Sequence, residues 1–77
     1  MNGICLDNNK EDQDSGVTVA PGKLSLDECL DWCKKRRFAT GCEYQFDLQK
    51  CVVHTQDVWD VSGDKGSLCT FIHRDKG

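Results

Sequence analysis

Six cysteines in a chain of 77 residues are the feature that most restricts what this sequence can fold into. A domain of this length buries a smaller share of its surface than a larger one, so its hydrophobic core alone gives marginal stability. Small secreted domains commonly compensate with disulfide bonds, and an even number of cysteines is typical of them. We therefore expect a single extracellular domain over residues 1–77 that is held by three bridges. In the chain-entropy description each bridge contributes about 2–4 kcal/mol.

The composition agrees with this expectation and argues against several other classes of protein. Hydrophobic residues make up 38% of the chain and the mean hydropathy is −0.58, which describes a thin core under a polar surface. No apolar run approaches the roughly 20 residues that span a bilayer, so we expect no membrane insertion. A net charge of −3 argues against a nucleic-acid partner. The first residues lack a signal-peptide pattern, so a secreted form would correspond to the mature domain without its signal peptide.

The segment LSLDECLDWCKKRR predicts an α-helix over residues 26–38. Ser25 and Glu28 have the spacing of a capping box, and acidic residues in the first turn suit the positive end of the helix dipole. The basic run of residues 34–37 falls in the last predicted turns, where positive charge is favourable, and Gly41 is a suitable stop. This is the clearest local element of the chain.

Strands are expected on both sides of this helix. Residues 42–48 alternate between apolar and polar side chains, which predicts a half-buried strand with Tyr44 and Phe46 in the core. Residues 51–55 are interpreted as its hairpin partner. Further short strands are expected at residues 3–6, 17–20 and 68–73. The predicted fold class is therefore α+β, with one helix packed on a small antiparallel sheet.

The cysteines are placed to clamp the helix on that sheet. Cys29 and Cys33 are four residues apart, so both thiols project from one helix face. Cys42 and Cys51 begin the two hairpin strands, and two bridges from helix to hairpin would hold the layers together. The spacing leaves open which helix cysteine meets which strand cysteine. The other two cysteines lie near the ends of the chain and can tie those ends together.

Metal and redox roles are the alternatives for these cysteines, and their spacing disfavours both. Zinc sites commonly show two cysteine pairs two to four residues apart, and only Cys29 and Cys33 form such a pair here. A CxxC redox motif is absent from the sequence. His54 and His73 are isolated and are better explained as exposed or hairpin residues than as ligands. The acidic loop at residues 7–16 does not match an EF-hand, so we expect a solvated loop, no metal and no cofactor.

Taken together, these segments resemble the PAN/apple domain family. A helix with two cysteines, followed by GCEYQF and KCVVHT on a hairpin, is similar to the family pattern over residues 3–73. The resemblance implies two nested bridges, Cys29–Cys51 and Cys33–Cys42, and a third bridge, Cys5–Cys69, that joins the ends. PAN/apple modules are extracellular binding domains for proteins or carbohydrates, heparin-like glycans among them. The resemblance therefore implies recognition without catalysis.

Charge and aromaticity point to the candidate binding residues. The candidates are Trp32, Lys34, Lys35, Arg36, Arg37 and Trp59. Four consecutive residues on a helix spread over all its faces, so a basic patch would need Lys23, Lys50 or Arg74 to converge with the run. The alternative for the basic run is that it stabilises the helix C-terminus. The alternative for both tryptophans is packing at the edge of the core.

The function we expect is extracellular recognition or adhesion, with a glycan or a protein as the partner. Two histidines on separate segments do not provide a nucleophile with its base and orienting group, so we expect no enzyme. Two other classes remain open. One is a secreted signalling or inhibitory mini-protein that acts on a receptor or a protease. The other is an extracellular matrix or mineral-associated structural protein that uses its acidic loop.

Overall fold

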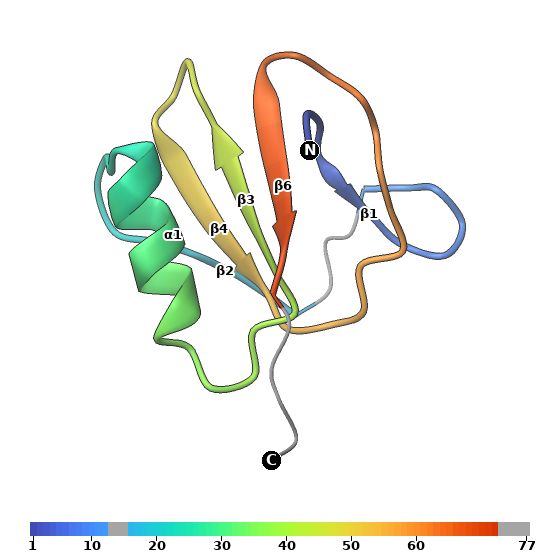
Figure 1. Ribbon diagram of the computed structural model, residues 1–77, viewed down its shortest axis with the longest axis horizontal. Coiled ribbons are helices and arrows are strands. Elements are labelled where there is room, and N and C mark those ends of the chain that lie inside the picture. The colour runs from blue at the N-terminus through green and yellow to red at the C-terminus, as the bar shows by residue number, and fades with distance from the viewer. Residues whose placement is uncertain (13–15, 73–77) are drawn as a thin grey trace.

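The computed structural model describes residues 1–12 and 16–72, which form one helix and six short strands. The helix α1 spans Leu26–Lys34. The strands are β1 Cys5–Leu6, β2 Val17–Val19, β3 Gly41–Gln45, β4 Lys50–His54, β5 Asp60–Val61 and β6 Ser67–Phe71. An antiparallel sheet has the strand order β2-β4-β3-β6, and β1 pairs with β5 separately. Figure 1 shows α1 against one side of this sheet, which confirms the predicted α+β class.

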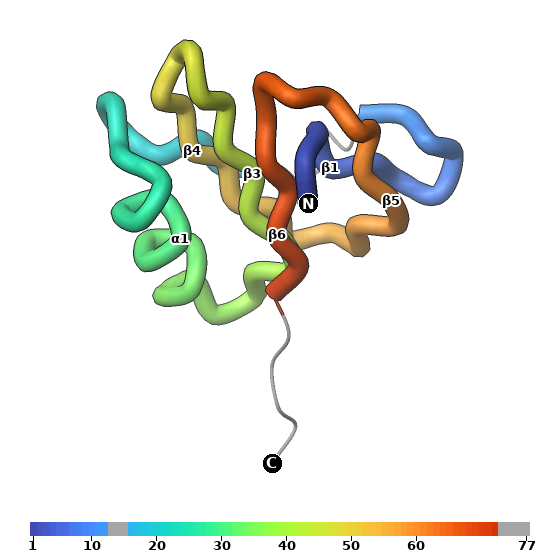
Figure 2. Tube along the Cα trace, turned by 45° about the horizontal axis from the view of Figure 1, so that its top comes forward, coloured from blue at the N-terminus to red at the C-terminus, as the bar shows by residue number. Residues whose placement is uncertain are grey.

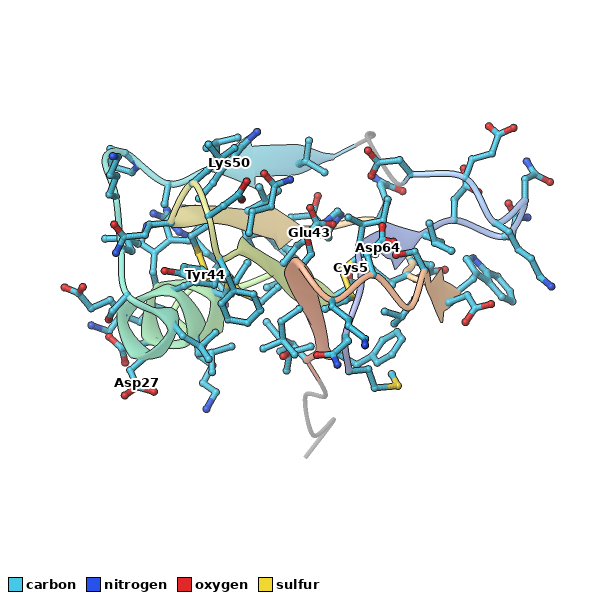
Figure 3. All side chains as sticks on the ribbon, turned by 90° about the horizontal axis from the view of Figure 1, so that it is seen from above. Cys5, Asp27, Glu43, Tyr44, Lys50 and Asp64 are labelled. Atoms are coloured by element: carbon cyan, nitrogen blue, oxygen red, sulfur yellow. A yellow bond between two sulfur atoms is a disulfide. The ribbon has the colours of Figure 1, made fainter. Side chains whose placement is uncertain are left out.

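The β3–β4 hairpin forms the middle of the sheet and decides which residues face α1. Tyr44 lies opposite Cys51 in the register, and Glu43 lies opposite Val52. Successive residues of a strand point to opposite faces, and directly opposed residues share a face. Figure 3 shows the result, with Tyr44 on the helix side and Glu43 on the other side beside Cys5. Each face of the sheet therefore carries a different set of side chains.

The helix begins as its capping box predicts and ends earlier than expected. The Ser25 hydroxyl accepts a hydrogen bond from the Glu28 backbone N–H, and the Glu28 carboxylate accepts one from the Ser25 N–H. The last helical residue is Lys34, so the prediction of a helix through residue 38 is wrong at its C-terminal end. The Ala39 N–H donates to the Arg36 carbonyl in a turn that leads the chain back toward the sheet. This early reversal lets the buried Ala39 join the core.

The strand β3 is also shorter than the alternating pattern predicts. It ends at Gln45, and residues 46–49 form the hairpin turn, with Gln49 in the left-handed region at φ 49°. Of the predicted core pair, Tyr44 is buried, whereas Phe46 is exposed, so its assignment to the core is wrong. The Phe46 ring meets the Tyr44 ring edge-on, with centroids 5.4 Å apart. The apolar alternation misleads here because it continues into the turn.

The core between α1 and the sheet is small and rich in sulfur. Its buried members are Ala20, Cys29, Cys33, Ala39, Cys42, Tyr44, Cys51 and Val53. Two nested disulfides, Cys29–Cys51 and Cys33–Cys42, cross this layer. They touch each other, since the Sγ atoms of Cys29 and Cys42 are 3.4 Å apart. The implied pairing of helix and hairpin cysteines is therefore confirmed.

The third disulfide, Cys5–Cys69, lies on the face of the sheet away from α1. It fastens the N-terminal segment to β6, as the resemblance implied. The Met1 amino group donates to the Cys69 carbonyl, and the Gly3 N–H donates to the Ser67 carbonyl. Figure 2 shows the N-terminus beside β6. The chain start thus lies along one edge of the sheet, and the three-residue strand β2 forms the other edge.

Candidate functional site

The predicted basic run lies at the C-terminal end of α1, where the structure divides it into two parts. Lys34 closes the helix and Lys35 caps it, with the Lys35 Nζ atom 2.9 Å from an Asp31 carboxylate oxygen. Exposed pairs of this kind contribute about 1 kcal/mol or less. Arg36 and Arg37 lie beyond the helix and are exposed. The two lysines therefore lie where they stabilise the C-terminal end of the helix, and the two arginines lie beyond that end.

Trp32 and Arg36 form a stacked pair on this surface. The Arg36 guanidinium carbon lies 4.4 Å from the centroid of the Trp32 ring, which is a cation–π distance. The Trp32 side chain is half-buried and packs against the core cluster. Of the two interpretations of Trp32, packing at the core edge is therefore the one the structure supports. Its second role is to support the guanidinium of Arg36.

Phe38 adds an exposed aromatic ring directly after the two arginines, and sequence reasoning did not identify it. This residue is 76% exposed. The predicted helix included residue 38, so the sequence did not indicate that this ring is exposed. The chain turns after Lys34, and this turn places Phe38 on the surface. We call Trp32, Arg36, Arg37 and Phe38 the helix-end surface. A large exposed aromatic side chain that directly follows two exposed arginines, one of them stacked on Trp32, is a feature that folding alone does not require.

The other predicted residues do not join the helix-end surface. Lys23 precedes the N-cap and so lies at the opposite end of α1. Lys50 faces the other side of the sheet, where it lines a pocket. Trp59 is exposed and directly precedes β5, which lies across the molecule from α1 in Figure 2. Arg74 and His73 lie outside the described residues. Neither Lys23 nor Lys50 therefore lies near residues 34–37, as a larger basic patch would require.

A pocket of about 130 Å³ lies on the face of the sheet away from α1. Its lining comes from β2, β3, β4 and the acidic loop, and consists of Asp12, Val17, Val19, Glu43, Gln45, Lys50, Val52 and His54. The strand residues share this face because they alternate with the residues that point toward α1. Glu43 is only 5% exposed and His54 only 1%. The pocket therefore has two buried ionisable groups in its lining.

Glu43 is a buried carboxylate with several polar neighbours. Its Oε1 atom accepts a hydrogen bond of 2.9 Å from the Cys5 N–H, and the Nε2 atom of His54 is 3.5 Å from the same oxygen. Burial raises the pKa of Glu43, but interactions with His54, the Cys5 N–H and Gln45 outweigh it, so the pKa is lowered from 4.5. The carboxylate is therefore ionised at neutral pH.

His54 is a hairpin residue, as predicted, but it is buried instead of exposed. Neither of its ring nitrogens makes a hydrogen bond within the described part of the chain. The sequence contains no local signal for this burial, because Glu43 falls on the polar side of β3 and the sequence of β4 does not alternate strictly between apolar and polar residues. They are covered by residues distant in sequence, with Cys5 contacting Glu43 and Val17 pairing with His54.

The four cysteines between α1 and the hairpin also form a compact group. Their sulfur atoms lie within 4.8 Å of one another, a spacing that would suit a metal ion. Zinc binds cysteine as a thiolate, however, and all four sulfurs are engaged in disulfides. In the oxidised protein this group is therefore a structural clamp.

Comparison with known proteins adds no assignment to this geometry. No family model, curated protein or solved structure matches the chain. Among the helices of the described residues, none has the length and apolar character needed to cross a membrane. Three disulfides in a domain of this size are consistent with an extracellular location. The argument for function therefore depends on the sites themselves.

Proposed function

We propose that this protein is a secreted, non-catalytic recognition module of the PAN/apple type that binds sulfated glycans at the helix-end surface. The observation that carries the proposal is the exposed ring of Phe38, which follows two exposed arginines, one of them stacked on Trp32. A sulfated glycan alternates anionic groups with sugar rings. A surface that combines cations with an aromatic ring is complementary to both.

The arginines suit the anionic groups of such a ligand. A guanidinium presents N–H donors in a planar fork that matches oxyanions, and these charge-assisted hydrogen bonds are stronger than neutral ones. Arg36 rests on the Trp32 ring, so it has less side-chain freedom to lose when a ligand binds. Arg36 would therefore contribute more to affinity than a freely rotating lysine.

Phe38 suits the remainder of the ligand. Aromatic residues and arginine are enriched in binding surfaces, where they supply most of the binding energy from few positions. The apolar face of a sugar ring can pack on the exposed Phe38 ring while its sulfate groups meet Arg36 and Arg37. The three disulfides support the secreted location, since such bridges persist outside the cytosol.

Retention of the oxidised protein on immobilised heparin at physiological ionic strength tests the proposal. The double variant Arg36→Gln/Arg37→Gln should elute without retention, and Phe38→Ser should elute earlier than wild type although its charge is unchanged. The control Lys23→Gln/Lys65→Gln removes two positive charges away from the helix-end surface and should still be retained. Desulfated heparin should not retain the wild type. If both double variants lose retention equally, or if the wild type is not retained, the helix-end surface is not the site that binds sulfated glycans.

A further inference from the structure

The pocket on the other face of the sheet contains a buried histidine whose ring nitrogens lack a hydrogen bond within the described residues, although one of them lies 3.5 Å from a Glu43 oxygen. His54 is 1% exposed, and neither ring nitrogen makes a hydrogen bond within the described residues. Leaving a buried polar group unpaired costs about 1–3 kcal/mol. Most buried side-chain polar atoms in proteins do have a partner, so an unpaired one needs an explanation. A bound ligand at this position would provide it.

The geometry around His54 indicates what kind of ligand this is. Its Nε2 atom lies 3.5 Å from the Oε1 atom of Glu43, which is longer than an ordinary N–H···O hydrogen bond. A zinc ion holds an imidazole nitrogen and a carboxylate oxygen at about 2.0–2.2 Å each in a tetrahedral arrangement. Two such ligand atoms are then about 3.4 Å apart. The separation of the two side chains therefore matches that of two ligands of one metal ion.

The surroundings of Glu43 also suit a metal ligand. The Cys5 N–H donates to its Oε1 atom, and a hydrogen bond of this kind fixes the orientation of a ligating carboxylate. The Cys5 sulfur lies within 4.8 Å of the ligand atoms of Glu43 and His54, but it is bonded to Cys69 and offers no thiolate. The protein thus provides two close ligand atoms, and the remaining coordination positions of the metal ion would open into the pocket.

The charges lining the pocket favour a cation near His54. Asp12 adds a second carboxylate to the lining. Lys50 is the first residue of β4 and His54 the last, so the lysine backbone lies about 13 Å along the strand from His54. Lys50 is therefore attached to the opposite end of β4 from His54, whereas the carboxylate of Glu43 lies 3.5 Å from the His54 ring.

We propose that Glu43 and His54 bind a transition-metal ion of the zinc class at the base of this pocket, with water or a group of a second ligand completing its coordination. An imidazole ligand selects zinc, copper or nickel over calcium and magnesium, which prefer oxygen ligands. This site lies on the opposite face of the sheet from α1, and it does not depend on glycan binding at the helix-end surface.

Titration calorimetry of the oxidised, chelator-treated protein with zinc chloride tests this inference. Wild type should bind one zinc ion saturably, and calcium chloride should give no saturable heat. His54→Gln and Glu43→Gln should each weaken the affinity for zinc by more than about tenfold, because each removes a ligand. The matched control is His73→Ala, which removes the only other histidine of the chain and should leave the affinity unchanged.

An NMR titration of wild-type protein with ¹⁵N-labelled histidine rings decides the question without any substitution. Zinc should change the ring-nitrogen resonances of His54 and leave those of His73 in place. The readout remains valid even if a variant at position 43 or 54 fails to fold. No saturable binding by the wild type, or binding that follows His73 in either experiment, would overturn the proposal.

Discussion

The two faces of the central sheet are both covered, but different interactions hold their covers in place. On the α1 face, an apolar layer and two nested disulfides bury residues such as Tyr44 and Val53. On the other face, one disulfide and backbone hydrogen bonds hold a thin N-terminal segment over Glu43 and His54. The first face is stabilised chiefly by burial of apolar surface, which pH hardly changes. The second depends on ionisable groups and a single disulfide, so it should respond more strongly to pH and to metals than the first.

The largest expected difference between the faces comes from removing their disulfides. The double variant Cys5→Ala/Cys69→Ala opens a loop with a sequence separation of 64 and should lower the free energy of unfolding by about 4 kcal/mol. The variant Cys33→Ala/Cys42→Ala opens a loop with a separation of 9 and should cost about 2.5 kcal/mol. Urea unfolding of both proteins measures the two values. In hydrogen exchange, the first variant should lose protection in residues 1–6 while α1 keeps its protection. An equal loss of protection in α1 and in residues 1–6 would show that the two faces of the sheet do not unfold independently.

A smaller difference is expected from acid. The pKa of Glu43 is lowered in the folded protein, so its contribution to stability is fully present above the ordinary pKa of 4.5 and is lost as the pH falls through the lowered value. Urea unfolding between pH 7 and pH 2.5, with a chelator present, should therefore show stability falling on the acid side. At neutral pH, Glu43→Ala leaves the buried Cys5 N–H unpaired and should cost about 1–3 kcal/mol.

The control for this prediction is on the α1 side of the molecule. Hydrogen bonds from Ser25 lower the pKa of Glu28 as well, but Glu28 is exposed. The acid-induced loss of stability should therefore be flatter in Glu43→Gln than in Glu28→Gln. An unchanged acid profile in Glu43→Gln would mean that the carboxylate at position 43 is not the sensitive group.

The smallest effect is expected where the α1 side meets solvent. Phe38 is 76% exposed, so Phe38→Ser should change the free energy of unfolding by less than about 0.5 kcal/mol. Urea unfolding of Phe38→Ser, compared with its retention on heparin, shows whether Phe38 contributes to stability or to binding. A loss above about 1 kcal/mol would place Phe38 in the packing of the fold and would weaken its assignment to the helix-end surface.

The same contrast explains which parts of the molecule could be predicted from the sequence. The α1 side could be predicted because its signals are local in the sequence, such as the capping box at Ser25 and the four-residue spacing of Cys29 and Cys33. The burial of Glu43 and His54 depends on contacts with Cys5 and Val17, which are far away in sequence. Periodicity places Glu43 on the polar side of its strand, and it contains no information about distant residues that cover Glu43 and His54.

The errors at the ends of elements have a similar cause. A helix pattern and an alternating pattern both continue past the points where the chain turns, so Phe38 is placed inside the predicted helix and Phe46 in the predicted core. The turn after Lys34 returns the chain to the sheet, and Gln49 adopts a left-handed conformation in the hairpin turn. Arg36 and Arg37 were already candidates, whereas the addition of Phe38 required knowledge of that first turn.

The arrangement of the sheet edges bears on how the protein behaves at high concentration. An exposed strand edge can pair with the same edge of another molecule and so begin aggregation. Residues 1–3 lie along β6 and donate and accept hydrogen bonds there, which occupies that edge. The other edge, β2, has three residues and is followed at once by Ala20 and Pro21, and proline has no N–H to donate. Growth of the sheet from one molecule to the next is therefore blocked on one side and limited to a very short strand on the other.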